Sequence, residues 1–276
     1  MKASVGGYAR AKDVRHAIDL LGGSDGMGRV LAGGQSLLAA MNMGLSAGDM
    51  LVDITGIASL RGTRLEGDRL VIGALTRHSE IAADPLIAEH APLLARAVPF
   101  IAHDAIRNRG TIGGSIAHAD PAAEFPACAL ALGATILLEG PDGTREVAAE
   151  EFFVEVFETA IAEGEILTAI AVPLKARGEV QAIREAARRA GDYALVGLAA
   201  VRRDGAHRVA AFGAGPRPML CTGAMQALDA GDVDGAATAI AGDLDPPSDT
   251  QASAAYRKHL AGVLLRRLVA DMGEGA

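Results

Sequence analysis

The amino-acid sequence predicts an α+β protein of two or three subdomains, and three observations support this fold class. First, its 276 residues exceed what one small hydrophobic core usually organises. Second, the opening section alternates short apolar strands (29–32 and 50–55) with helical patterns. Third, hairpin patterns follow, and after Pro173 the chain changes to strands followed by alanine-rich helices.

The opening section is predicted to be a small α/β unit. Val14, Ala17, Ile18 and Leu21 recur at helical spacing, and two glycines follow them. The strand RVLA is followed by the glycine-containing segment GGQS and then by the apolar run LLAAM. The order strand, glycine turn and helix is therefore expected here.

The middle of the chain is predicted to contain two hairpins, in residues 65–75 around Gly67 and in residues 134–147. TRHSE predicts a capping box with Thr76 as the N-cap of a helix. Residues 91–102 are expected to form a helix, and residues 165–173 a closing strand. In the last third, two strands are predicted within 194–215 and a long amphipathic helix in 253–272.

Net charge and hydropathy indicate which partners the protein binds and in which compartment it lies. The formal net charge is −8, whereas nucleic-acid binding rests on Lys and Arg that neutralise phosphates. No signal peptide and no apolar run long enough to span a bilayer are found. We therefore expect a cytoplasmic protein that binds neither nucleic acid nor membranes.

The cysteine and histidine patterns predict no metal site in this chain. Cys128 and Cys221 are expected to be free thiols, and an iron–sulfur cluster usually takes four cysteine ligands. His78, His103 and His118 are too scattered for a zinc motif, so we expect turn or surface histidines. Any cluster that the chemistry requires should lie on another polypeptide.

Two glycine-rich segments are the strongest indication of a ligand. AGGQS (32–36) and TIGGS (111–115) each join two glycines to a serine. Successive N–H groups in such turns, near a helix start, favour an anion, and two such turns suggest a ligand with two phosphates. Spacing alone leaves open the alternative of two unrelated turns. The G-x-G-x-x-G pattern is absent, so a Rossmann crevice is not predicted.

These segments, together with ADPAAEFPA (119–127), resemble the FAD-binding medium subunits of molybdenum hydroxylases, such as aerobic carbon monoxide dehydrogenase and bacterial xanthine dehydrogenase. YARAKDVRHAIDLL, EILTAIAVP and RRAGDYALVGLAAV are also similar to segments of that family. The resemblance implies a two-lobed FAD-binding fold of vanillyl-alcohol-oxidase type plus a C-terminal α/β domain. The implied domains are an N-terminal FAD-binding lobe (1–55), a second FAD-binding lobe (56–174) and a C-terminal domain (175–276).

The resemblance also implies a set of cofactor-binding residues. The two glycine segments would hold the pyrophosphate of a non-covalent FAD, and Glu124, where the family more often has Asp, would bind flavin-chain hydroxyls. Ile101 and Tyr193 would flank the isoalloxazine ring, Leu167 would lie near it, and Arg184 falls where some relatives have a lysine. The complete set is Ala32, Gly33, Gly34, Gln35, Ser36, Ile101, Thr111, Ile112, Gly113, Gly114, Ser115, Glu124, Leu167, Arg184 and Tyr193.

The function that the resemblance implies is that of an electron-transfer oxidoreductase subunit. Its partners would be a small [2Fe–2S] subunit and a large molybdenum subunit, in a dimer of heterotrimers. A stand-alone flavin-dependent oxidoreductase is the alternative, and Tyr193 is its only candidate catalytic base. A third, non-enzymatic possibility is a nucleotide-binding interaction module.

Overall fold

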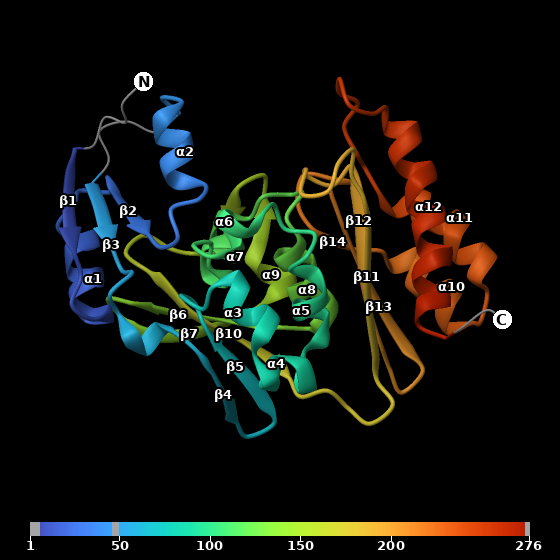
Figure 1. Ribbon diagram of the computed structural model, residues 1–276, viewed down its shortest axis with the longest axis horizontal. Helices are drawn as coiled ribbons and strands as arrows, with labels where there is room; N and C mark the ends of the chain where they lie inside the picture. The colour runs from blue at the N-terminus through green and yellow to red at the C-terminus, as the bar shows by residue number, and fades with distance from the viewer. Residues whose placement is uncertain (1–5, 46–49, 274–276) are drawn as a thin grey trace.

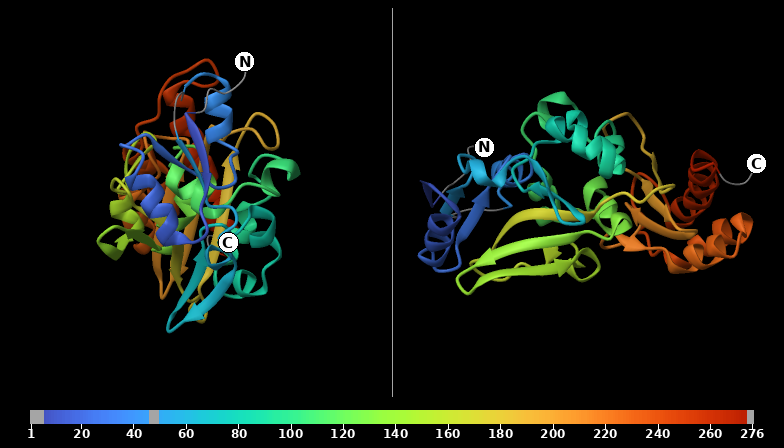
Figure 2. Two further views of the ribbon diagram at one scale, coloured as in Figure 1. Left: turned by 90° about the vertical axis from the view of Figure 1, so that its left-hand side faces the viewer. Right: turned by 90° about the horizontal axis from the view of Figure 1, so that it is seen from below.

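A computed structural model describes residues 6–45 and 50–273 of the chain. Within these ranges, three β-sheets of three or more strands follow one another from the N-terminal to the C-terminal side of an elongated molecule (Figures 1 and 2). These sheets define a first, a second and a third part of the molecule. Among the described residues, no helix is long and apolar enough to cross a membrane.

The first part is a parallel sheet with helices on it, as the strand–helix alternation predicts. β1 (Gly7–Arg10) and β2 (Gly28–Leu31) both pair in parallel with the central β3 (Met50–Asp53). α1 (Val14–Gly22) begins where the carboxylate of Asp13 accepts a hydrogen bond from the N–H of His16. α2 (Leu37–Asn42) follows β2, so the first glycine turn connects the carboxyl end of β2 to the start of α2.

The second part is an antiparallel sheet in the order β4-β5-β10-β6-β7. The two predicted hairpins are confirmed as β4–β5 and β6–β7, and β10 lies between them. Its strands and those of a small separate hairpin, β8–β9, are β4 (Thr63–Glu66), β5 (Arg69–Gly73), β6 (Thr135–Gly140), β7 (Gly143–Ala148), β8 (Phe153–Glu155), β9 (Glu158–Thr159) and β10 (Ile166–Pro173). Its helices are η1 (Ala58–Leu60), α3 (His78–Ala83), α4 (Pro85–His90), α5 (Pro92–Ala97), α6 (Asp104–Arg107), α7 (Ile112–His118), α8 (Glu124–Leu132) and α9 (Ala149–Phe152).

Two local expectations in the second part are wrong. α3 is capped by Arg77, whose N–H donates to the Glu80 carboxylate at 2.8 Å, because the hydroxyl of Thr76 instead bonds the backbone of Gly62. The helix expected over 91–102 ends at Ala97, because Pro99 has no N–H to continue it.

The third part is an antiparallel sheet with helices on one face and the second part on the other. Its strands are β11 (Val180–Ala186), β12 (Val196–Arg203), β13 (Ala206–Phe212) and β14 (Met219–Leu220). Its helices are α10 (Thr222–Asp229), α11 (Val233–Asp243) and α12 (Ala254–Asp271). Along β12, Leu198 and Ala200 join the core under these helices, whereas Ala199 and Val201 join the core of the second part. The strand is therefore apolar on both faces.

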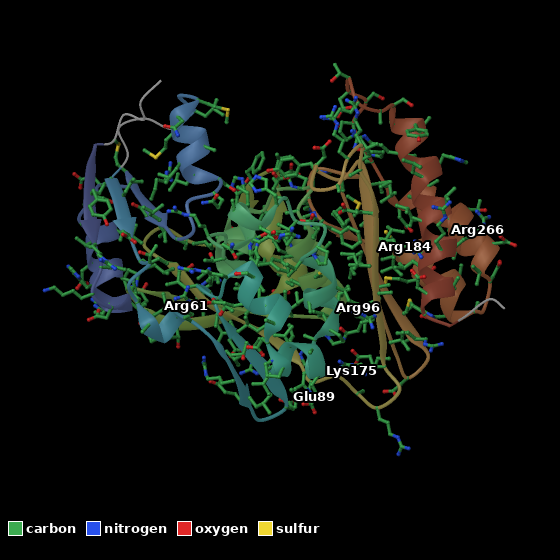
Figure 3. All side chains as sticks on the ribbon, in the orientation of Figure 1. Arg61, Glu89, Arg96, Lys175, Arg184 and Arg266 are labelled. Atoms are coloured by element: carbon green, nitrogen blue, oxygen red, sulfur yellow. The ribbon has the colours of Figure 1, made fainter. Side chains whose placement is uncertain are left out.

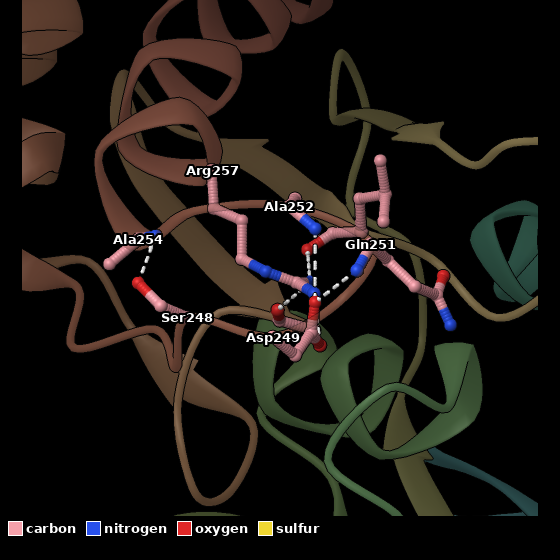
Figure 4. Close-up of polar contacts among 8 residues, drawn as sticks. Ser248, Asp249, Gln251, Ala252, Ala254 and Arg257 are labelled. Carbon is pink, nitrogen blue, oxygen red and sulfur yellow. Dashed lines mark hydrogen bonds and ion pairs between the residues drawn. The ribbon is translucent and has the colours of Figure 1, made fainter.

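A buried arginine ties α12 to the loops beside this sheet. The guanidinium of Arg257 donates to the carbonyls of Leu195 and Gly213 and to the carboxylate of Asp249 at 2.7 Å (Figure 4). The N–H of Gly213 in turn donates to the carbonyl of Pro121 at 2.8 Å. These contacts fix the third part against the loop between α7 and α8, which borders the site described next.

Candidate functional site

A cleft of about 520 Å³ lies where the three parts meet. The first part contributes the turn between β2 and α2, and the second contributes α6, α7 and the loop after α7 (Figure 1). The third part contributes the segment 191–193 before β12. The predicted site residues that line this cleft are Ala32, Gly33, Gly34, Gln35, Ser36, Ile101, Thr111, Gly113, Gly114, Ser115, Glu124, Leu167 and Tyr193.

The first glycine turn offers free backbone donors. Gly34 has φ +72°, a conformation that favours glycine, and Gly33 packs so closely that an added Cβ would lie 2.3 Å from the carbonyl oxygen of Arg109. Within the described chain, the N–H groups of residues 33–36 have no hydrogen-bond acceptor. A turn of this kind, followed by a helix start, suits an anionic group.

The second glycine segment has a different structure from the expected open turn. Thr111 is the N-cap of α7, and its hydroxyl accepts from the N–H of Gly114 at 3.1 Å. The N–H groups of Ile112, Gly113 and Ser115 donate to backbone carbonyls, so all four donors are used within the protein. The expectation that these N–H groups converge on an anion is therefore not met. The cap uses the N–H of Gly114, the carbonyls of Ala74 and Thr76 accept from Gly113 and Ile112, and Ser115 makes an intrahelical bond.

Close packing explains the glycines of this second segment. A Cβ on Gly113 would lie 2.5 Å from the Cβ of Ala74, inside the protein. A Cβ on Gly114 would meet the Thr111 hydroxyl at 2.9 Å and would be 3.9 Å from the Cβ of Ala32, across the cleft. The two glycine segments thus face each other, with Gly114 at the cleft wall.

His78 is a buried cleft residue that sequence reasoning misplaced. Its side chain lies in the wall against the ring of Phe125, edge to face with centroids 5.0 Å apart. Neither ring nitrogen makes a hydrogen bond of normal geometry to a described residue. Burial, opposed by the nearby Thr111 backbone, lowers the pKa of His78 to about 4, so the imidazole is neutral at pH 7. A lone histidine between Arg77 and Ser79 gives no signal of this burial.

His118 was also expected to be a turn or surface residue. It is half-buried at the end of α7, lines the cleft and stacks on Phe157 with ring centroids 4.9 Å apart. Burial lowers its pKa. His103, in contrast, is exposed, as expected.

Carboxyl groups gather at the end of the cleft formed by the second and third parts. Glu124, at the start of α8, is 8% exposed, and burial together with the charges of Glu185 and Asp120 raises its pKa to about 8. Burial also raises the pKa of Glu185, on β11, to about 7. Tyr193 is exposed on the neighbouring loop, and partial desolvation, followed by the charges of Asp120 and Glu124, raises the pKa of its hydroxyl.

Two predicted site residues lie outside the cleft lining. Ile112 is 1% exposed and packs into the core behind the first turn of α7. Arg184 projects from β11 toward α12, where its guanidinium pairs with the carboxylate of Asp271 (Figure 3). This position makes Arg184 a contact within the third part. Sequence similarity could not show which face of β11 carries it.

Comparison with known proteins identifies the class. Residues 3–175 match the family described as the FAD binding domain in molybdopterin dehydrogenase, and residues 181–272 match the CO dehydrogenase flavoprotein C-terminal domain. The chain is 36% identical to the carbon monoxide dehydrogenase medium chain of Hydrogenophaga pseudoflava, over 94% of each chain. It is 35% identical to the 6-hydroxypseudooxynicotine dehydrogenase complex subunit alpha of Paenarthrobacter nicotinovorans, over 95% of this chain and 93% of the other.

Solved structures agree with the sequence comparison. A chain of the carbon monoxide dehydrogenase from Hydrogenophaga pseudoflava superposes with a TM-score of 0.93, at 35% identity and 98% coverage of both chains. A chain of quinoline 2-oxidoreductase from Pseudomonas putida superposes with a TM-score of 0.91, at 33% identity, covering 99% of this chain and 98% of the other.

The fold and the cleft thus define an oxidoreductase component that binds FAD. The chain belongs to the FAD-binding medium subunits of the molybdenum hydroxylases, the family that includes carbon monoxide dehydrogenase medium chains and xanthine dehydrogenase FAD-binding subunits. The residues present fit this cofactor, because the first glycine turn has free N–H donors and the cleft has the size of a small-molecule site.

Proposed function

We propose that this chain is the electron-transfer subunit of a molybdenum hydroxylase complex. It would receive electrons from [2Fe–2S] clusters of a small partner subunit and pass them to an external acceptor. The observation that carries the proposal is the convergence of all three parts on one cleft with a glycine turn prepared for an anion. When bound, FAD supplies a group that handles one or two electrons.

We infer the need for partner subunits from the small number of side chains in this chain that could bind an iron–sulfur cluster. Its two cysteines, Cys128 and Cys221, are buried free thiols, and burial raises the pKa of both. Within residues 6–45 and 50–273, no group of three metal-binding side chains is found. Relatives named as medium chains support an assembly with small and large subunits, which we propose is a cytoplasmic dimer of heterotrimers.

We propose that the cleft holds FAD non-covalently, in a defined orientation. The N–H groups of residues 33–36 would bind the pyrophosphate, and Gly114 would allow its close approach from the other wall. Glu124 would bind flavin-chain hydroxyls, and Ile101, Leu167 and Tyr193 would surround the ring. Because Arg184 is engaged by Asp271, we assign it no cofactor contact.

The pKa of Tyr193 favours this function over a stand-alone oxidoreductase. A catalytic base must lose its proton near neutral pH, but the tyrosine pKa is raised above its ordinary value of 10. We therefore propose that Tyr193 covers the ring and excludes water, and that substrate is oxidised on a partner.

The test is substrate-dependent flavin reduction with and without partners. The purified chain, supplied with FAD, should show flavin absorption and release free FAD on acid precipitation. Substrate should bleach that absorption only after the iron–sulfur and molybdenum subunits are added. Full reduction by substrate of the chain alone would contradict the proposal and favour the stand-alone enzyme, and flavin retained in the precipitate would contradict non-covalent binding.

A further inference from the structure

A second cavity of about 520 Å³ lies beside the FAD cleft, on the other side of the contact between the two glycine segments. Ala32, Gly33, Leu75 and Thr111 line both cavities and separate them. Residues 55–57, which follow β3, form one side of its wall, and the second part contributes the segments around η1, α3 and α6. Gly34, Ser36, Gly114 and Ser115 line only the FAD cleft.

The charged side chains that line this cavity are all arginines. Arg61, Arg77 and Arg109 surround it, and no carboxylate is among its lining residues (Figure 3 labels Arg61, at the junction of the first two parts). Arg10 lies at the rim, because a Cβ on Gly56 would be 2.9 Å from its guanidinium. Positive charge thus concentrates in one concavity of a chain whose net charge is −8.

Internal ion pairs neutralise little of this charge. Arg61 reaches the carboxylate of Glu80 at 3.3 Å, and both side chains are 42% exposed. The guanidinium groups of Arg77 and Arg109 make no hydrogen bond or ion pair with any described residue. Two guanidinium forks with no partner in the described part of the chain can therefore receive an anion, and their planar geometry matches phosphate oxygens.

The remaining wall indicates what the anion is attached to. Ile57, Ala58 and Leu75 provide apolar surface beside the polar side chains of Thr55 and Asn108. The volume lies in the range of small-molecule sites and exceeds what a bare phosphate needs. We propose that this cavity is a second binding site, separate from the FAD cleft, for a small organic phosphate.

The test uses adenosine monophosphate as the probe and the protein saturated with FAD, so that the glycine turn is occupied. Calorimetry should show saturable binding that weakens about tenfold or more in the double variant Arg77→Gln/Arg109→Gln, because each arginine supplies charge-assisted hydrogen bonds. The matched control, Arg15→Gln/Arg64→Gln, removes two arginines that line neither cavity and should bind as the parent does. Inorganic phosphate should bind more weakly than adenosine monophosphate.

A second measurement needs no variant. Adenosine monophosphate should protect Arg77 and Arg109, but not Arg15, from modification by phenylglyoxal in the FAD-saturated protein. Absence of saturable binding, equal binding by the double variant, or equal affinity for inorganic phosphate would overturn the proposal. Loss of FAD from a folded double variant would also overturn it, because the cavity would then belong to the cofactor site.

Discussion

The Glu124 carboxyl is held in its uncharged form by its surroundings. Its pKa in the folded chain is about 8, against an ordinary value of 4.5, so the unfolded chain releases the proton first as pH rises. Below pH 4.5 the carboxyl is neutral in both states and costs no folding free energy. The folded state loses stability relative to the unfolded state as the pH rises from 4.5 toward 8. At pH 7 the cost is roughly 3 kcal/mol.

Glu124→Gln should remove this cost in the FAD-free protein. The gain in unfolding free energy over wild type should grow by about 1.4 kcal/mol per pH unit between about pH 5 and 7.5, because glutamine does not titrate. Urea unfolding at several pH values measures it. Glu151→Gln, at an exposed position of α9, is the control. Parallel pH profiles for Glu124→Gln and wild type would show that the carboxyl is not held neutral.

His78 should give the opposite pH dependence. Its folded pKa of about 4 lies below the ordinary 6.5, so the unfolded chain takes up a proton first as pH falls. Stability should decline between pH 6.5 and 4 by roughly 3 kcal/mol, and His78→Leu should lack this part of the decline. Unfolding curves across this range measure the effect, with the exposed His103→Leu as the control. An equal decline in both variants would contradict it.

At the scale of single elements, the two glycines in the first turn of α7 have different roles, because Gly113 packs inside the protein and Gly114 faces the cleft. Gly113→Val should prevent folding or cost several kcal/mol, because its Cβ would enter Ala74 inside the protein. Gly114→Val should leave the chain folded but abolish FAD binding, because its side chain would project toward Ala32 across the cleft. Circular dichroism and flavin content after purification separate the two results. Full FAD content in Gly114→Val would show that the pyrophosphate lies elsewhere.

The sequence predicted those elements whose conformation is determined by residues close together in the chain. The apolar spacing of α1, the turn of β4–β5 and the glycines of the β2–α2 turn are all readable within a few residues. β1 was missed because its four residues, GYAR, carry no alternation and are fixed by pairing with β3. The register of that pairing depends on a strand some 40 residues away, which no short window contains.

The candidate site was predictable in part for the same reason. The residues of the two glycine segments could be recognised as motifs, and the structure brings them together on one cleft. The burial of His78 and the turn of Arg184 toward Asp271 depend on tertiary packing. The division into domains at residues 55 and 174, and the cofactor role of each residue, stay predictions.

At the scale of the whole molecule, FAD should tighten one region and leave another unchanged. The cleft draws on all three parts, whereas α10 and α11 lie beyond the third sheet, away from it (Figure 1). FAD should therefore slow amide hydrogen exchange in α2, α7 and residues 191–193, with α10 and α11 unaffected. Mass spectrometry of exchanged peptides measures this. Equal protection in all helices would contradict a cleft confined to this junction.

The central position of β10 sets the order in which the protein can be built on the ribosome. β5 and β6 each pair with β10 and not with each other. The hairpins β4–β5 and β6–β7 therefore each keep one unpaired edge strand until β10, which ends at Pro173, has been synthesised. The N–H of Ala74, against which Gly113 packs, bonds the carbonyl of Thr168 in that same strand at 2.9 Å. The wall of the cleft is thus completed only after β10 has been synthesised, and we expect FAD loading to follow that step.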